Sequence, residues 1–173
     1  MEIETKRLFL KKHEPQDFNR FWDMINDPVA KQYTGGVTQL NYIQRLEMFK
    51  KECSEAFSNN DIEFAVREKD SGKYLGYCGF RISAELGGNE FFYGYCRDCW
   101  EQGYGFEAAD AVLRYLFTAF SHDSYIATAD THNIASVKIL KKLGFKNIDQ
   151  IVCEDLGAVD RYIIEKKDYL ASL

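Results

Sequence analysis

Two glycines, at positions 103 and 105, mark the segment whose residue types come closest to a chemical function. The segment reads Trp-Glu-Gln-Gly-Tyr-Gly-Phe-Glu-Ala from Trp100 to Ala108 and joins an apolar stretch to a helical pattern. The first backbone N–H groups of a helix have no partner within it, so they can bind an anion. Glycine removes the Cβ atom where a phosphate approaches and tolerates left-handed backbone angles. The segment predicts an anion site, with an ordinary tight turn as the alternative.

The glycine segment differs from two other nucleotide-binding motifs. It lacks the third glycine of the dinucleotide-binding fingerprint, and it lacks the Gly-Lys-Ser or Gly-Lys-Thr sequence of a phosphate-binding loop. Both hydride transfer and phosphoryl transfer are therefore poorly supported by this part of the sequence.

A second motif follows about one strand later in the chain. It begins with Asn-Ile-Ala-Ser at 133–136 and ends with Lys-Leu-Gly-Phe at 142–145. Together with the glycine segment, it resembles the acetyl-CoA-binding core of the GNAT acetyltransferase superfamily. The stretch from Glu4 to Leu10 resembles the first strand of the RimJ/RimL-like branch, which contains the ribosomal-protein-alanine acetyltransferases. Further similar positions in that branch are Asp17, Asp27-Pro28, Tyr162 to Ile164 and Asp168-Tyr169.

The resemblance implies a cofactor site between two parallel strands that splay apart, Phe91 to Cys96 and Tyr125 to Ala129. The pantetheine arm of acetyl-CoA would lie in the gap and pair with the backbone near Tyr95. Asn133 would hydrogen-bond the cofactor, and Ser136 would lie near its sulfur. The diphosphate would meet the backbone N–H groups of Gln102, Gly103, Tyr104, Gly105 and Phe106.

Two positions differ from many members of the superfamily. Trp100 stands where Gln or Arg is common, although an aromatic residue is familiar in this branch. Leu140 stands where many relatives have a tyrosine that protonates the leaving thiolate, so another group or water must do so here. Ser136 is the candidate for that role. Taken alone, Ser136 would be a residue of a helix face and Asn133 or His132 a helix N-cap.

Acetyl transfer to an amine requires a neutral amine and a proton acceptor. An α-amino group with a pKa of about 8 is roughly one-tenth neutral at pH 7, whereas a lysine amine near 10.4 is under one part in a thousand. In the RimJ/RimL-like branch, a Glu just ahead of the central strand corresponds to Glu90. We therefore predict that Glu90 accepts the proton, directly or through a water; the alternative is a surface Glu at a hairpin end.

The predicted base has to overcome a mismatch in pKa. An unperturbed Glu has a pKa of about 4.3, some 3.5 units below that of the α-amine, which corresponds to roughly 5 kcal/mol. Burial of Glu90 against Phe91 and Phe92 is expected to raise its pKa and reduce this mismatch.

Other polar and aromatic residues have structural interpretations beside the functional ones. Cys96 and Cys99 form a Cys-X-X-Cys motif, but no second ligand pair is spaced to complete a zinc site, so no metal is predicted. A thiol-redox protein built on these two cysteines stays an alternative. Trp22, Tyr33 and Tyr42 either line an acceptor pocket between two early helices or belong to the core. Four lysines either attract the adenosine phosphate or form a solvated helix face: Lys138, Lys141, Lys142 and Lys146.

An α/β framework is expected to position these motifs. Helical periodicity predicts helices from Pro15 to Asp27-Pro28 and over 40–57, 103–120 and 133–143. Strands are predicted over 7–12, 62–67, 73–82, 90–96, 125–129, 145–153 and 158–165. The segment 90–96 is apolar on both alternating faces, which predicts a central strand buried on both sides. The expected fold is α/β (α+β), with a mixed, mostly antiparallel sheet of about seven strands, a splayed parallel pair and flanking helices.

The composition indicates one domain spanning residues 1–173. The chain is 46% hydrophobic, has two prolines, and contains no stretch that resembles a linker. Five cysteines, an odd number, fit reduced thiols better than a set of disulfides. The N-terminal residues are charged and do not resemble a signal peptide. A cytoplasmic protein without membrane contact is therefore expected. The net charge of −5 argues against a nucleic-acid partner and favours a cationic substrate.

The predicted function is an N-acetyltransferase that uses acetyl-CoA as co-substrate and no metal. Its acceptor is a primary amine, for example a protein N-terminal α-amine, which attacks directly in a ternary complex. A small amine or an aminoglycoside is the alternative acceptor. The alternative of another class is an acyl-CoA-binding sensor module without turnover. The chain is expected to be a monomer or a homodimer.

Overall fold

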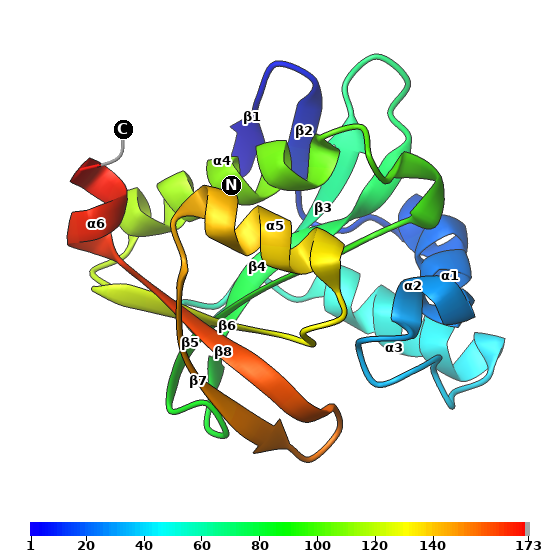
Figure 1. The fold of residues 1–173 in the computed structure, drawn as a ribbon. Helices are drawn as coiled ribbons and strands as arrows, with labels where there is room; N and C mark the ends of the chain where they lie inside the picture. The colour runs from blue at the N-terminus through cyan, green and yellow to red at the C-terminus, as the bar shows by residue number, and fades with distance from the viewer. Residues whose placement is uncertain (172–173) are drawn as a thin grey trace.

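An eight-stranded sheet with helices on both faces forms the framework of the computed structural model, which describes residues 1–171 (Figure 1). The strand order is β1-β2-β3-β4-β5-β6-β8-β7. All neighbouring strands are antiparallel except β5 and β6, which are parallel. In chain order the elements are β1 (Glu2–Glu4), β2 (Leu8–Lys11), the 3-10 turn η1 (Pro15–Asp17), α1 (Phe18–Asn26), α2 (Pro28–Lys31), α3 (Tyr42–Ser54), β3 (Asp61–Glu68), β4 (Tyr74–Ser83), β5 (Gly88–Tyr95), the 3-10 turn η2 (Arg97–Cys99), α4 (Tyr104–Ala119), β6 (Ser124–Ala129), α5 (Ile134–Leu143), β7 (Lys146–Cys153), β8 (Gly157–Glu165) and α6 (Lys166–Ala171).

The mixed sheet with one parallel pair confirms the predicted fold class, but the number of strands was predicted one too low. The additional strand is β1, which pairs Ile3 with Leu10 of β2. A strand of three residues is too short to show a clear alternation of apolar and polar side chains, so the sequence pattern alone does not reveal it.

The segment predicted as one helix from Pro15 to Asp27-Pro28 is divided into three parts. A 3-10 turn precedes α1, and α2 follows at once. The carboxylate of Asp27 accepts hydrogen bonds from the backbone N–H groups of Val29 at 2.9 Å and Ala30 at 3.4 Å. Asp27 therefore caps a new short helix. Pro28 lies in its first turn, where a backbone N–H would have no partner within the helix, so the lack of one costs nothing.

The helices lie on opposite faces of the sheet. In Figure 1, α4 and α5 cross one face side by side, whereas α1, α2 and α3 group together at another side of the sheet. Alternate residues of a strand point to opposite faces. Thus Tyr93 and Tyr95 reach α5 and α4, whereas Tyr77 of β4 contacts Phe21 of α1. The largest fully buried side chains between these layers include Leu8, Leu10, Phe64, Phe80, Leu113, Leu116 and Tyr125.

Strand β5 is central, as predicted, but it is not buried on both sides. Phe91 is 2% exposed, and the other residues of β5 are half-buried. The reason lies in the sheet itself, because β6 pairs with β5 only at Glu90 and leaves the rest of that edge without a neighbouring strand.

A buried ion pair joins the 3-10 turn η1 to β3. Asp17 is 3% exposed and Arg67 is 6% exposed. The Nε atom of Arg67 donates to Oδ1 of Asp17 at 3.0 Å, and Nη2 of Arg67 donates to Oδ2. The same carboxylate accepts the backbone N–H of Glu14 at 2.8 Å, so it also shapes the turn that leads into α1.

Candidate active site

The gap between β5 and β6 is bordered by strand backbone. The two strands are in register only at Glu90 and Ile126 and then separate. Farther along, the backbone N–H of Cys96 donates to the Leu75 carbonyl of β4 at 2.8 Å. Because backbone groups alternate sides along a strand, the N–H of Tyr95 points away from β4, toward the gap. The carbonyl of Tyr95 already accepts the indole N–H of Trp100 at 2.9 Å.

The glycine segment forms a concave turn at the start of α4. Gly103 is the N-cap with φ of +80°, and Glu101 before it has φ of +61°. The first hydrogen bond to the helix runs from the Glu107 N–H to the Gly103 carbonyl at 3.2 Å. The N–H groups of the first three helical residues therefore have no partner within the helix, which suits them to an anion. These residues are Tyr104, Gly105 and Phe106.

The side chains of this segment are held by contacts outside it. Gln102 donates from Nε2 to the Asp98 carbonyl at 3.1 Å, and the hydroxyl of Tyr104 donates to Glu68 at 2.6 Å. Lys142 of α5 lies over the ring of Phe106, with its Nζ atom 3.8 Å from the ring centroid. The backbone of the segment is thus left to meet a ligand while its side chains hold it in place.

Gly105 lies where α4, α5 and β5 meet. A Cβ atom there would lie 3.0 Å from Cδ1 of Ile139 and 3.1 Å from Cε2 of Tyr95. The hydroxyl of Tyr95 donates to the Gly105 carbonyl at 3.1 Å. A residue without a side chain is needed here for the three elements to approach this closely.

Asn133 and Ser136 lie together in the first turn of α5. Oδ1 of Asn133 accepts the Ser136 N–H at 3.2 Å, so Asn133 is the N-cap of the helix. Among residues 1–171, the Nδ2 atom of Asn133 has no hydrogen-bond partner, which leaves it available to a ligand. Leu140, on the same helix, is 1% exposed and belongs to the core.

Residues 7–146 match the family described as "Acetyltransferase (GNAT) domain". The chain belongs to the GNAT acetyltransferase family. It is 27% identical over 145 residues to "Uncharacterized N-acetyltransferase p20" of Bacillus licheniformis, covering 83% of this chain and 82% of that protein. It is 28% identical over 151 residues to "Uncharacterized N-acetyltransferase YnaD" of Bacillus subtilis, covering 84% and 83%.

Solved GNAT structures share the fold. An acetyltransferase of the GNAT family from Bacillus anthracis has a TM-score of 0.81 and 21% identity, covering 96% of this chain and 99% of that chain. A spermidine N-acetyltransferase from Vibrio cholerae, in complex with CoA and spermine, has a TM-score of 0.79 and 17% identity, with the same coverage. The assignment to the RimJ/RimL-like branch stays a prediction.

Tyr93 contacts the predicted site residue Ser136, and it was not itself predicted as a site residue from the sequence. Its hydroxyl lies 3.0 Å from Oγ of Ser136 and 3.2 Å from the Ser136 carbonyl. Burial raises the pKa of Tyr93, although the hydrogen bond with Ser136 opposes the change. The signal was present in the sequence, because the alternation of Phe91, Tyr93 and Tyr95 places all three on the face that carries α4 and α5.

Glu90 lies on the opposite face from Phe91 and has a charged partner. Its Oε2 atom accepts Nε of Arg81 at 2.7 Å, and its side chain is 12% exposed. Burial of Glu90 against both Phe91 and Phe92 was predicted from the sequence. Strand alternation prevents this, since Phe91 points toward the other face of the sheet.

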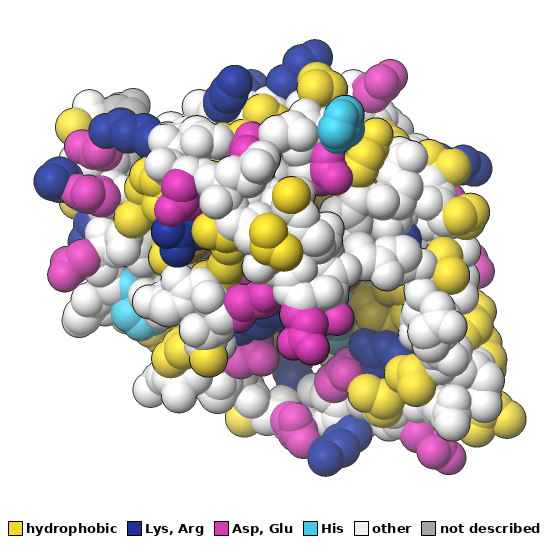
Figure 2. Space-filling view, turned by 60° about the horizontal axis from the view of Figure 1, so that its bottom comes forward, with side chains coloured by type: hydrophobic (Ala, Val, Ile, Leu, Met, Phe, Trp, Pro, Cys, Tyr) yellow, Lys and Arg dark blue, Asp and Glu magenta, His cyan; other side chains and the backbone are white. Residues whose placement is uncertain are grey.

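Carboxylates surround Arg81 on this face of the sheet. Asp61, Arg81 and Glu90 are neighbours across β3, β4 and β5, and Glu63 occupies the next position on the same side of β3. Burial, followed by the charge of Glu63, raises the pKa of Asp61, whereas Arg81 opposes the change. Figure 2, which turns the bottom of Figure 1 forward, shows acidic side chains gathered with basic ones beside a hollow.

The early helices contribute aromatic residues beside this face. Trp22 and Tyr42 have ring centroids 5.3 Å apart in an edge-on arrangement, and the hydroxyl of Tyr42 donates to Asn19 at 3.0 Å. Tyr33 is half-buried in the turn after α2. Gly35, in the same turn, lies beside Leu156 of the β7–β8 connection, so loops from the two ends of the chain meet here.

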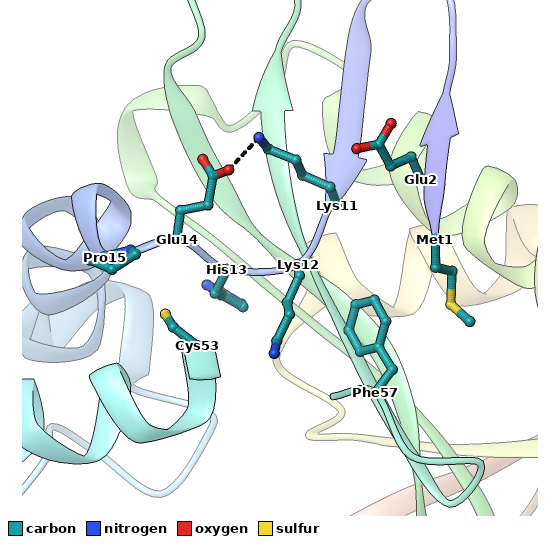
Figure 3. Close-up of a pocket in the computed structure, with 9 residues that line it drawn as sticks. All are labelled: Met1, Glu2, Lys11, Lys12, His13, Glu14, Pro15, Cys53 and Phe57. Atoms are coloured by element: carbon teal, nitrogen blue, oxygen red, sulfur yellow. Dashed lines mark hydrogen bonds and ion pairs between the residues drawn. The ribbon is translucent and has the colours of Figure 1, made fainter. Parts of the chain in front are cut away.

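A pocket of about 410 Å³ lies beside the ends of β1, β2 and α3 (Figure 3). It contains His13, which is 8% exposed and has Nε2 2.8 Å from Oε1 of Glu63. Figure 3 shows Lys11 paired with Glu14 at its rim. None of the residues that line it belongs to β5, β6, α4 or α5, so this pocket is not part of the predicted cofactor site.

The thiols of the Cys-X-X-Cys pair interact with backbone carbonyls. The thiol of Cys99 donates to the Cys96 carbonyl at 2.8 Å. Burial raises the pKa of Cys96 to about 11 and that of Cys99 to about 12, so both thiols are protonated and unreactive at neutral pH.

Within residues 1–171 there is no group of three or more His, Cys, Asp or Glu residues suited to a metal, and no helix is long and apolar enough to cross a bilayer.

Proposed function

We propose that this GNAT protein transfers the acetyl group of acetyl-CoA to the primary amine of a small cationic acceptor. The observation that supports this acceptor class is the carboxylate cluster on the sheet face opposite α4 and α5, where Asp61, Glu63 and Glu90 lie around Arg81. One guanidinium lies among these three carboxylates, and the imidazole of His13 contacts Glu63 at 2.8 Å, so the acidic groups outnumber the basic ones and attract a cation. The structural neighbour from Vibrio cholerae is a spermidine N-acetyltransferase, which is in keeping with this proposal.

A protein N-terminal α-amine is the second candidate acceptor, as in the RimJ/RimL-like enzymes that the sequence resembles. Its lower pKa leaves a larger neutral fraction at pH 7 than that of an alkylamine, so it demands less of a base. A polyamine carries further positive charges that the carboxylate cluster can bind, and an isolated N-terminus lacks them. For this reason we place the small cationic amine first.

The residues of the glycine segment are suited to hold the cofactor. We assign the diphosphate to the backbone N–H groups of Gln102 to Phe106, because those at the start of α4 lack partners within the helix and are suited to an anion. The free Nδ2 of Asn133 and the N–H of Tyr95 are assigned to the pantetheine arm.

We propose direct attack in a ternary complex. The amine nitrogen attacks the thioester carbonyl carbon, the new C–N bond forms, and the C–S bond breaks with its electron pair on sulfur. One proton leaves the amine, and one proton is needed at the thiolate. Glu90 accepts the first proton directly or through a water, while Arg81 holds its carboxylate in place at 2.7 Å.

On the sulfur side, we assign donation of the proton to the thiolate to Ser136, with Tyr93 as its hydrogen-bond partner; water then returns a proton to this pair of hydroxyls. Their hydroxyl oxygens lie 3.0 Å apart, and Leu140 leaves no hydroxyl at the position that often carries the acid. A neutral hydroxyl donor aimed at the departing sulfur lowers the energy of the developing charge.

The test is the release of free thiol from acetyl-CoA in the presence of spermidine, an aminoglycoside, or a peptide with a free N-terminus. We expect the strongest stimulation with spermidine. In the variant Asp61→Asn, the KM for spermidine should rise about tenfold while the KM for acetyl-CoA stays unchanged. Binding of CoA without release of thiol stimulated by any amine would support the sensor-module alternative instead. Unchanged turnover of the Glu90→Gln variant across pH would rule out Glu90 as the base.

A further inference from the structure

Arg7 lies against the loop to which the proposed function assigns the diphosphate. Its Nη1 atom donates to the Gln102 carbonyl at 2.8 Å, and its Nε atom donates to Oε2 of Glu107 at 2.7 Å. The guanidinium also lies over the ring of Tyr104, 4.4 Å from the centroid. One side chain from the β1–β2 connection therefore contacts both the loop and the first turn of α4, about one hundred residues later in the chain.

Glu107 holds the same connection from the other side. Its Oε1 atom accepts the hydroxyl of Thr5 at 2.5 Å and the backbone N–H of Arg7 at 2.9 Å. With the bond to Nε of Arg7, the carboxylate of Glu107 thus accepts three hydrogen bonds from this short connection. Hydrogen bonds to a charged group are stronger than those between neutral groups, so this is a firm attachment.

The bond to the Gln102 carbonyl sets the direction of the next N–H group. All peptide bonds of the described chain are trans, and in a trans peptide the C=O and N–H groups point to opposite sides. The N–H of Gly103 therefore points away from Arg7. Glu101 adopts φ of +61°, which is disfavoured for a residue with a Cβ atom, so the loop requires contacts from outside to keep its shape.

We propose that Arg7 is a positioning residue that holds the loop at 101–103 in its anion-binding conformation before the cofactor arrives. The inference rests on the proposed function, because it assumes that this loop binds the diphosphate. The Nη2 atom of Arg7 has no hydrogen-bond partner within residues 1–171 and lies 3.3 Å from the position of a Cβ on Gly103.

The experiment compares Arg7→Gln with Lys6→Gln. Lys6 is the exposed neighbour, and no hydrogen bond or ion pair to it is found in the described structure, so its variant removes the same charge without touching the loop. Binding of CoA is measured by calorimetry, and turnover is measured with both acetyl-CoA and S-acetylpantetheine, which has no diphosphate. We expect Arg7→Gln to weaken CoA binding by roughly ten- to a hundredfold. The KM for S-acetylpantetheine and the kcat should change less than threefold.

The matched variants separate positioning from general damage to the fold. Arg7→Lys keeps the charge but cannot bind two acceptors in a fixed geometry, so it should resemble Arg7→Gln more than the wild type. Equal losses with acetyl-CoA and S-acetylpantetheine, CoA binding by Arg7→Gln as tight as that of the wild type, or an equal effect of Lys6→Gln would overturn the inference. If the wild-type protein itself fails to bind CoA, the proposed function fails first, and the two failures are distinguishable.

Discussion

At the scale of single residues, the hydroxyl of Tyr93 and that of Ser136 form one hydrogen-bonded pair, contributed by β5 and α5. Because burial raises the pKa of Tyr93, its phenol remains neutral throughout the pH range of an assay and keeps its proton to donate. A residue that is buried, neutral and held by a hydroxyl partner is a fixed donor, and fixed donors need little reorganisation when charge develops nearby.

Removing the Tyr93 hydroxyl should therefore slow the chemical step. In Tyr93→Phe we expect kcat to fall about tenfold or more, with a change of less than threefold in the KM for acetyl-CoA. If the two hydroxyls act as a unit, the double variant with Ser136→Ala should lose little beyond the larger single loss. Tyr125→Phe is the matched control, since Tyr125 is buried and its hydroxyl contacts His122. A normal kcat in Tyr93→Phe would remove Tyr93 from the mechanism.

At the scale of elements, the approach of α4, α5 and β5 depends on the missing side chain at Gly105. Alanine is the better helix former by about 1 kcal/mol, yet its Cβ would press on Ile139 and Tyr95. We expect Gly105→Ala to weaken CoA binding severalfold with little loss of thermal stability. Adding Ile139→Val removes the Cδ1 atom and should restore part of the affinity. Calorimetry with CoA and thermal unfolding measure both effects, and unchanged binding in Gly105→Ala would contradict this account.

The helices that border the site could be predicted because each carries its own start and stop signals. Predicted over 133–143, α5 spans Ile134–Leu143; Asn133 caps its start, and Gly144 ends it with φ of +94°. The parallel pairing of β5 and β6 followed from the strand–helix–strand pattern, whereas their splay followed from the family resemblance.

The partners of the site residues could not be predicted in the same way. That Glu90 meets Arg81 depends on the register of the β4–β5 hairpin, and that Arg7 meets Glu107 depends on how distant segments pack. Neither contact leaves a periodic pattern in the nearby sequence from which it could be predicted. Tyr93 is different, since strand alternation alone places it on the same face of the strand as Phe91 and Tyr95.

At the scale of the whole molecule, the buried pair of Asp17 and Arg67 joins the early helices to the sheet. Removing one partner leaves an uncompensated charge in the interior, which costs about 3–5 kcal/mol. We therefore expect Asp17→Asn to lower the urea midpoint strongly. Asp149→Asn breaks the exposed pair with Arg161 and should change the midpoint far less. Similar midpoints for the two variants would show that burial of the Asp17 pair contributes little.

The single register pair between β5 and β6 divides the sheet into two panels with a seam between them. The panel of β1 to β5 and the panel of β6, β8 and β7 are joined along this seam by one step of the backbone ladder. In addition, α4 packs on the first panel, α5 packs on β6 of the second, and the two helices contact each other. A ligand that pairs with both edges of the seam links the two panels, because one panel can then unfold only if its bonds to the ligand are broken. The ligand's affinity and the cooperativity of unfolding therefore both report how strongly the two panels are coupled. The ligand raises the free energy of unfolding by RT ln(1 + [L]/Kd).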